Sequence, residues 1–207
     1  IARIPMNQFT NAYVQMFFLL APFFGVSMFL RMSEGMEKPA RRNAALRCGA
    51  AVLVATFVFF FFGRPLFHLI GITLPAFQIG AGSTLFVSSL MLVLGLGKRG
   101  SNGTDPDSDF SVVPLGIPII VGPGTIGTLM VWSTEIAEPV QRIATAGAIL
   151  CCGLTVLILL LMAEKIQKWL GGQMLSILTK VSALILVALA AQIIFTGIDS
   201  FLFAGRV

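Results

Sequence analysis

The sequence has too little charge for a protein surrounded by water. Only 11% of its 207 residues are Asp, Glu, Lys or Arg, whereas a soluble domain has about a quarter of its residues charged. Hydrophobic residues make up 57% of the chain, and the mean hydropathy is +0.93. A soluble globular fold is therefore excluded, and the sequence indicates an all-α integral membrane protein whose main partner is the lipid bilayer.

Cysteine and histidine are also scarce. The three cysteines, Cys48, Cys151 and Cys152, lie within or beside apolar runs, where a thiol behaves as a small hydrophobic group, so no disulfide framework is expected. The central halves of the apolar runs contain no Asp, Glu or His, and the sequence contains neither a Gly-x-Ser-x-Gly turn nor a pair of metal ligands. We therefore expect no enzyme, no metal site and no cofactor.

Six apolar runs are long enough, or nearly so, to cross about 30 Å of hydrocarbon, which takes roughly 20 helical residues. These runs are Phe9 to Leu30, Arg47 to Phe62, Leu74 to Leu96, Ser111 to Ser133, Ile143 to Met162 and Val181 to Phe203. A polar linker at 98–110 separates a first half, 1–97, from a second half, 111–207. No signal-peptide pattern opens the sequence, so the first run is expected to be the first span.

The basic residues are divided unequally between the two sets of loops. Ten of the fourteen Lys and Arg residues lie in or beside the loops after the first, third and fifth spans. Cytoplasmic loops carry the excess of positive charge, so the linker is predicted to be cytoplasmic and both termini extracytoplasmic. This placement accounts for the net charge of +5 without a nucleic-acid partner.

The two halves resemble each other at a spacing of 100 or 101 residues. The matching pairs are Arg42 with Arg142, Ala44 with Ala144, Gly71 with Gly171, Gly97 with Gly197 and Pro22 with Pro123. Because each half has an odd number of spans, the second enters the membrane from the opposite side, which predicts two inverted three-helix repeats with a substrate site between them. A plain six-helix scaffold is the alternative.

Proline and glycine interrupt the fourth span near its middle. The stretch from Val113 to Thr128 contains three prolines and four glycines, which remove backbone donors and favour non-helical angles. Pro123 lies about 15 Å from the end of the span, half the hydrocarbon thickness, so the helix is predicted to break at mid-depth and restart there. Pro22 holds the matching place in the first span, which predicts a second break facing the first.

A helix start at Pro123 leaves the amides of Gly124, Thr125 and Ile126 unpaired at a positive helix end, where a carboxylate or other anion binds. Missing Cβ atoms at Gly122 and Gly124 are expected to let a small zwitterionic solute approach the main chain, with its ammonium on carbonyls freed at the other break. Hydroxyl and amide groups add hydrogen bonds, and two phenylalanines wall the pocket. The candidate substrate-binding residues are Pro22, Phe23, Phe24, Gly25, Gly122, Pro123, Gly124, Thr125, Ile126, Thr128 and Gln192.

The stretch Val112-Val113-Pro114-Leu115-Gly116-Ile117-Pro118, followed by Gly122-Pro123-Gly124-Thr125-Ile126, resembles the MarC family, which includes SnatA-like small neutral amino acid transporters. Gly71-Ile72-Thr73-Leu74-Pro75-Ala76-Phe77 with Gly80-Ala81-Gly82 resembles the family's third span, and Ala191-Gln192 to Gly197 its last. The resemblance implies six spans in inverted halves, broken first and fourth helices, and alternating-access transport of small neutral amino acids such as glycine, alanine or serine across a bacterial or archaeal inner membrane.

The first half departs from the family's pattern. The family usually has Asp or Asn before the proline at Pro22, then Gly and Asn, where this chain has Ala21, Phe24, Gly25 and Ser27. The usual Arg of the third span is replaced by Gln78, which is expected to lie near a span end within reach of water.

The leading hypothesis is a carrier for small neutral amino acids. A second hypothesis is a non-transporting scaffold or drug-resistance-associated membrane protein. A third is an electron-transfer protein of the disulfide-relay kind that uses Cys48, Cys151 and Cys152. Each hypothesis is compatible with a homo-oligomer.

Overall fold

The computed structural model describes residues 6–95, 115–117 and 120–203 of the chain. All regular structure in these ranges is helical. The helices are α1 (Met6–Leu19), α2 (Pro22–Met32), α3 (Lys38–Ile70), α4 (Leu74–Val93), α5 (Pro123–Glu135), α6 (Pro139–Leu161) and α7 (Ala163–Phe203). The predicted all-α class is confirmed for the described part of the chain.

Within the described ranges, five helical stretches are long and apolar enough to cross a membrane. They are Gln8–Met32, which includes the break between α1 and α2, Lys38–Gly63, Leu74–Val93, Pro139–Leu161 and Ala163–Leu202. The predicted fourth span, Ser111 to Ser133, lies partly outside the described residues. Its described part is 115–117 and 120–133, and the 13-residue helix α5 begins within it and ends at Glu135. The chain is therefore a multi-pass membrane protein with five candidate spans in its described residues, and the remaining predicted span lies partly outside them.

Two predicted boundaries were wrong because charged residues were assigned to loops. The second span was expected from Arg47, but α3 begins at Lys38, so its first turns carry Arg41 and Arg42. The last span was expected from Val181, but α7 begins at Ala163 and bends at Gly171, where φ is 74°. Long basic side chains extend along a helix toward water, so helical structure continues past the apolar run.

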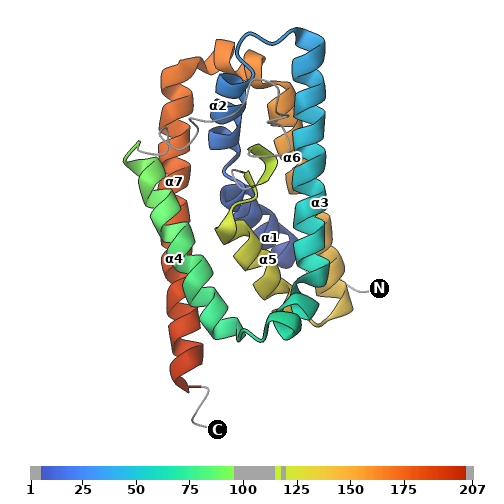
Figure 1. Ribbon diagram of the computed structural model, residues 1–207, viewed down its shortest axis with the longest axis vertical. Coiled ribbons are helices and arrows are strands. Elements are labelled where there is room, and N and C mark those ends of the chain that lie inside the picture. The colour runs from blue at the N-terminus through green and yellow to red at the C-terminus, as the bar shows by residue number, and fades with distance from the viewer. Residues whose placement is uncertain (1–5, 96–114, 118–119, 204–207) are drawn as a thin grey trace.

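The interrupted helices occupy the centre of the molecule. Figure 1 shows α1, α2 and α5 between a pair of helices formed by α3 and α6 and a second pair formed by α4 and α7. The first interrupted helix packs on α6 and α7, and α5 packs on α3 and α4. Phe29 and Leu129, from the two central segments, are almost fully buried.

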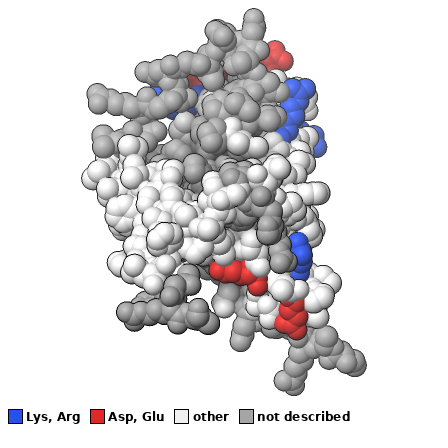
Figure 2. Space-filling model, turned by 60° about the horizontal axis from the view of Figure 1, so that its bottom comes forward, with Lys and Arg blue, Asp and Glu red and all other residues white. Residues whose placement is uncertain are grey.

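On the face drawn in Figure 2, uncharged described residues lie between two groups of charged residues. Large apolar side chains such as Val54, Ile143 and Phe195 are more than half exposed on the outward sides of their helices. A surface of this kind is suited to lipid acyl chains.

Candidate functional site

The first helix break lies at Leu20 and Ala21. Pro22 has no amide hydrogen, and Ala21 adopts the left-handed conformation with φ 43° and ψ 58°. The helical hydrogen bonds of α1 therefore end with the bond from the Leu20 amide to the Met16 carbonyl and restart in α2. The first bond of α2 runs from the Gly25 amide to the Ala21 carbonyl at 3.0 Å. Ala21 is the one non-glycine residue with positive φ in the described ranges.

The second break lies at Gly122. Helix α5 begins at Pro123, the residue at which the sequence predicted it. The predicted set of three unpaired amides is corrected, because the Ile126 amide already donates to the Gly122 carbonyl at 3.0 Å. Gly124 and Thr125 therefore supply the amides that precede the first hydrogen bond of α5.

The two breaks are in contact. The Thr125 hydroxyl donates a hydrogen bond to the Leu19 carbonyl at 3.0 Å, and these residues are only 1% and 4% exposed. Leu19 is the last residue of α1, so Thr125 takes up a carbonyl at the interrupted end of the other helix. Gly25 lies against Ile120, whose side chain would be 3.2 Å from an added Cβ.

The expectation that a missing side chain at Gly124 leaves room for a ligand is wrong. A Cβ at Gly124 would lie 2.5 Å from Leu85 Cδ1 and 2.7 Å from Leu85 Cβ, so this glycine allows α5 to approach α4. The next glycine of α5, Gly127, packs in the same way against Ala81. The space is filled by protein, and only the main chain of Gly124 remains a candidate for ligand recognition.

Most of the other predicted site residues lie near the two breaks, but one of them lies on the outside of the molecule. Phe23 stacks edge-on against Phe17, with ring centroids 6.0 Å apart, and Ile126 packs against the core. The buried Thr128 hydroxyl donates to the Gly124 carbonyl within α5 at 3.0 Å. Gln192 is exposed on α7 and is not a buried amide in need of a partner, which corrects its predicted place in the site.

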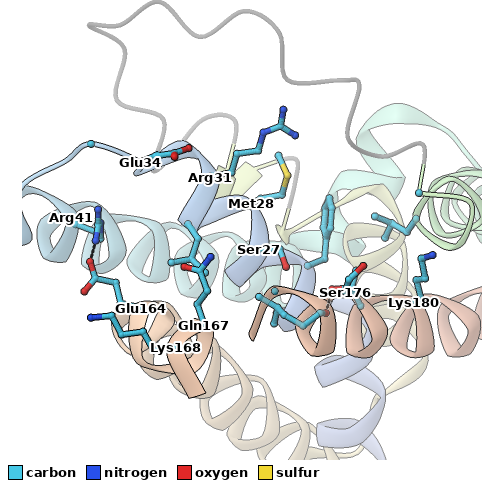
Figure 3. A pocket seen from close by; sticks show the side chains of 18 of the residues that line it. Ser27, Met28, Arg31, Glu34, Arg41, Glu164, Gln167, Lys168, Ser176 and Lys180 are labelled. Carbon is cyan, nitrogen blue, oxygen red and sulfur yellow. Dashed lines mark hydrogen bonds and ion pairs between the residues drawn. The ribbon is translucent and has the colours of Figure 1, made fainter. Parts of the chain in front are cut away.

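A cavity of about 770 Å³ opens at the end of the molecule where α2 ends and α3 and α7 begin. Its lining residues nearest the start of α2 are Phe24 and Ser27, two and five residues after Pro22. Figure 3 shows Arg31, Glu164, Lys168 and Lys180 among the side chains around it. The cavity thus connects the charged end of the molecule with the helix that follows the first break.

Sequence reasoning missed this cavity. Its polar residues come from segments far apart in the chain, and its basic residues had been interpreted only as markers of membrane topology. The polar lining residues are Ser27, Arg31, Glu34, Lys38, Arg41, Glu164, Gln167, Lys168, Ser176, Thr179 and Lys180. Polar positions on α2 and α7 were the available signal, but only the fold shows that they share one space.

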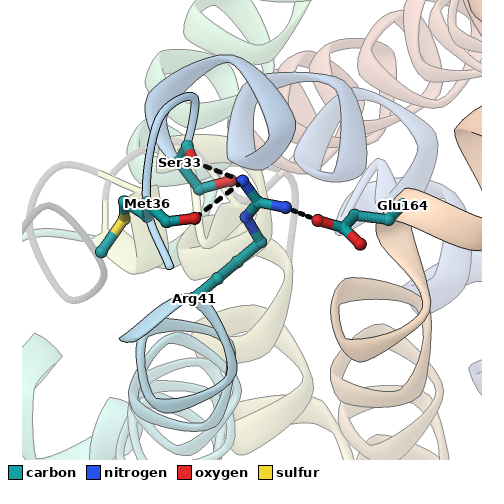
Figure 4. A network of polar contacts seen from close by, with 4 residues as sticks. All are labelled: Ser33, Met36, Arg41 and Glu164. Carbon is teal, nitrogen blue, oxygen red and sulfur yellow. Dashed lines mark hydrogen bonds and ion pairs between the residues drawn. The ribbon is translucent and has the colours of Figure 1, made fainter. Parts of the chain in front are cut away.

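One ion pair joins the two halves of the chain at the mouth of the cavity. Arg41 forms an ion pair with Glu164 in the first turn of α7 and donates hydrogen bonds to the carbonyls of Ser33, at 2.9 Å, and Met36, at 3.2 Å (Figure 4). A single guanidinium therefore holds the α2–α3 turn against the start of α7.

A second polar contact lies at the C-terminal end of α5, away from the break at Gly122. Gln78 is only 4% exposed, and its side-chain amide donates to Glu135 Oε1 at 3.4 Å, so its expected exposure to water is corrected. Glu135 is the last residue of α5, beyond the predicted end of the span, where the helix dipole disfavours a negative charge. Partial burial raises the pKa of Glu135, and the hydrogen bond from Gln78 lowers it.

The MarC family model, described as MarC family integral membrane protein, matches residues 6–202. The chain belongs to the MarC family.

Curated relatives cover nearly the whole MarC-family chain. A UPF0056 membrane protein of Pyrococcus abyssi is 32% identical over 197 residues, covering 93% of this chain and 95% of that protein. A UPF0056 membrane protein of Methanocaldococcus jannaschii is 31% identical over 199 residues, covering 93% and 97%. The UPF0056 inner membrane protein YhgN of Escherichia coli is 25% identical over 193 residues, covering 93% and 97%. No solved structure matches the chain significantly.

Proposed function

We propose that this MarC-family chain is a secondary transporter that moves small neutral amino acids of the glycine, alanine and serine type by alternating access. The observation that carries the proposal is the hydrogen bond between Thr125 and Leu19, which joins two interrupted membrane helices in the centre of the fold. Interrupted helices that meet in this way provide main-chain donors and acceptors deep in the membrane, where a small zwitterion needs both.

Reciprocal contacts support an inverted repeat. Gly49 on α3 packs against Leu157 on α6, and Gly153 on α6 packs against Leu53 on α3. The second pair lies 104 residues after the first, one helical turn away from the spacing of 100 found for Arg42 and Arg142, so the two contacts resemble each other with a shift of one turn. The repeat mates Gly71 and Gly171 also share a left-handed φ, 72° and 74°, immediately before the long helical stretches that end each half.

The contacts between helices also follow the proposed inverted repeat. The interrupted first helix lies on α6 and α7, and the interrupted fourth helix lies on their proposed counterparts α3 and α4. Under the repeat, α3 corresponds to α6 and α4 to α7, and each of these corresponding pairs is also in contact. The transport site is proposed to lie between the repeats, at the two breaks.

The proposed recognition uses the main chain. The amides of Gly124 and Thr125 at the start of α5 receive the substrate carboxylate, and carbonyls near Leu19 receive the ammonium. Phe24 limits the size of the substrate, since it lines the cavity between the break and the charged end. Gly124 and Thr125 are buried and do not line the cavity, so substrate entry requires the interrupted helices to separate.

The proposed orientation places the cavity in the cytoplasm. Five Lys and Arg residues in or beside the loops after the first and fifth spans line it, and cytoplasmic loops carry the excess of Lys and Arg. Both termini are then extracytoplasmic, and the membrane is the plasma or inner membrane of the cell.

The test is counterflow of labelled glycine, alanine and serine into liposomes that contain the purified protein. We expect uptake of label that depends on unlabelled amino acid inside, and weak competition by amino acid amides, which lack the carboxylate. Equal competition by acids and amides would remove the helix-end recognition. Absence of counterflow for all three solutes in a folded preparation would favour the scaffold hypothesis.

A further inference from the structure

The described lining of the cavity carries more positive charge than its own carboxylates neutralise. Five basic residues line it, together with two carboxylates, Glu34 and Glu164. In the described part of the chain, these lining residues form one ion pair, which joins Arg41 to Glu164. Four basic residues of the lining thus remain outside this ion pair, and they are Arg31, Lys38, Lys168 and Lys180. Glu34 is the acidic residue of the lining that remains beside them.

These four basic residues converge from three elements. Arg31 lies in the last turn of α2, Lys38 begins α3, and Lys168 and Lys180 lie on α7 on either side of the bend at Gly171. Figure 3 shows Arg31, Lys168 and Lys180 at separate places around the cavity. Like charges around a concave wall reinforce one another's potential, so the space attracts an anion more strongly than a flat basic surface does.

The remaining lining residues indicate what kind of anion fits. Phe24, Met28, Leu30, Leu92 and Leu175 supply apolar surface, and Ser27, Gln167, Ser176 and Thr179 supply hydrogen-bonding groups. The volume of about 770 Å³ far exceeds the needs of a small amino acid. A single carboxylate has two oxygens, whereas a phosphate group offers more acceptors and pairs well with Arg and Lys.

We propose that this cavity is a binding site for a phosphate-bearing anion, held by Arg31, Lys38, Lys168 and Lys180. Two sources have this chemistry, the headgroup of an anionic phospholipid and a soluble phosphate ester. The position of the cavity at the end of the membrane-crossing helices, with apolar and basic residues side by side, suits either source. The site is distinct from the two helix breaks and does not rest on transport.

Membrane topology alone does not account for this arrangement. Arg42 and Lys165 lie at the same end of the molecule, satisfy the same charge asymmetry and are exposed like the four proposed site residues, but they do not line the cavity. They provide a matched control, because their replacement removes the same charge from the same end of the protein without altering the lining.

The experiment uses the full-length protein, stripped of lipid in a neutral detergent. Phosphatidylglycerol, phosphatidylcholine and glycerol 3-phosphate are titrated separately, and binding is followed by native mass spectrometry and by the shift in melting temperature. We expect binding of phosphatidylglycerol or glycerol 3-phosphate but not of phosphatidylcholine, whose headgroup is neutral overall. Preference for the lipid assigns the site to a headgroup, and preference for glycerol 3-phosphate assigns it to a soluble ester.

The variants decide whether the cavity is responsible. The double variant Lys168→Gln and Lys180→Gln should bind the phosphate compound roughly tenfold or more weakly, since each basic residue contributes to holding the phosphate. Arg42→Gln with Lys165→Gln should leave binding near wild type, and Lys168→Arg with Lys180→Arg should retain it. Equal losses in both Gln pairs, or no binding of either phosphate compound by the wild-type protein, would overturn the proposal.

Discussion

The Thr125 hydroxyl and the Leu19 carbonyl, 106 residues apart in sequence, form a buried hydrogen bond of 3.0 Å between the two interrupted helices. The carbonyl belongs to the last residue of α1, and Pro22 cannot donate to the turn that precedes it. One side-chain hydroxyl from the second half of the chain thus completes the main-chain hydrogen bonding of the first.

Replacement of Thr125 by Val should destabilise the protein by about 1–3 kcal/mol, because the shape is kept while a buried carbonyl loses its donor. Thr125→Ser keeps the hydroxyl and should cost less. Denaturant unfolding in detergent micelles measures both. Equal stability of Thr125→Val and wild type would show that the carbonyl finds another donor.

Gly124→Ala should destabilise the protein by about 1–3 kcal/mol, since the new Cβ overlaps Leu85 on α4. Adding Leu85→Ala should recover only part of this loss, because Leu85 Cβ itself would lie 2.7 Å from the new atom. The measurement is a double-mutant cycle of unfolding free energies.

Gly80→Ala is the matched control for that cycle. Gly80 lies in α4, one turn before the Leu85 contact, and an added Cβ there meets no atom within 4 Å. Because alanine favours helix over glycine, this change should be neutral or stabilising by up to about 1 kcal/mol. A similar loss in Gly80→Ala and Gly124→Ala would contradict the packing explanation.

Ala21→Gly should stabilise the protein. An L-residue in the left-handed region costs roughly 1–2 kcal/mol, whereas glycine adopts it freely and loses about 0.5–1 kcal/mol in backbone entropy. The net gain is up to about 1 kcal/mol for φ 43° at Ala21. Ala148→Gly, in the buried interior of α6, should show the opposite sign in the same unfolding measurement.

Glu135 should make stability depend on pH. Burial raises the pKa of this carboxyl above its unfolded value, so the folded state favours the protonated form. The contribution of Glu135 to the free energy of unfolding is therefore present at low pH and is lost as the pH rises through the folded-state pKa. Glu135→Gln should flatten this part of the pH profile of the melting temperature. Gln78→Leu should extend the loss to higher pH, because the hydrogen bond that lowers the pKa is removed. A Glu135→Gln profile parallel to wild type would contradict this assignment.

Labelling in intact cells tests the orientation. In a background with Cys48, Cys151 and Cys152 replaced by Ala, a membrane-impermeant maleimide should react with Glu138→Cys from outside and with Lys165→Cys only after permeabilisation. Both native positions are exposed, and they lie at opposite ends of the molecule. The reverse pattern would place the cavity outside the cytoplasm.

The positions that could be predicted from the sequence depend on local chemistry. The helix start at Pro123 was predicted from the missing amide hydrogen of proline, and it is confirmed. The scarcity of charge and the apolar runs predicted the membrane class, and the resemblance predicted the family, which the match over residues 6–202 confirms.

The positions that were wrong depend on distant neighbours. Whether the bare Cα of Gly124 meets a ligand or Leu85 is decided by the approach of a helix that ends thirty residues earlier in the chain. Gln192 was predicted to need a partner because it lies in an apolar run, but the run alone does not tell which side of α7 faces α4. The basic residues of the cavity were predicted to be at one end, but their convergence on one space required the tertiary fold.

The shortness of α5 has a consequence for how the protein enters the membrane during synthesis. Its 13 residues span about 20 Å, less than the roughly 30 Å of hydrocarbon, so α5 by itself does not cross the bilayer. Both of the helices on which it packs, α3 and α4, precede it in the chain. We therefore expect α3 and α4 to be in the bilayer before α5 packs on them, which makes the order of translation part of the folding pathway.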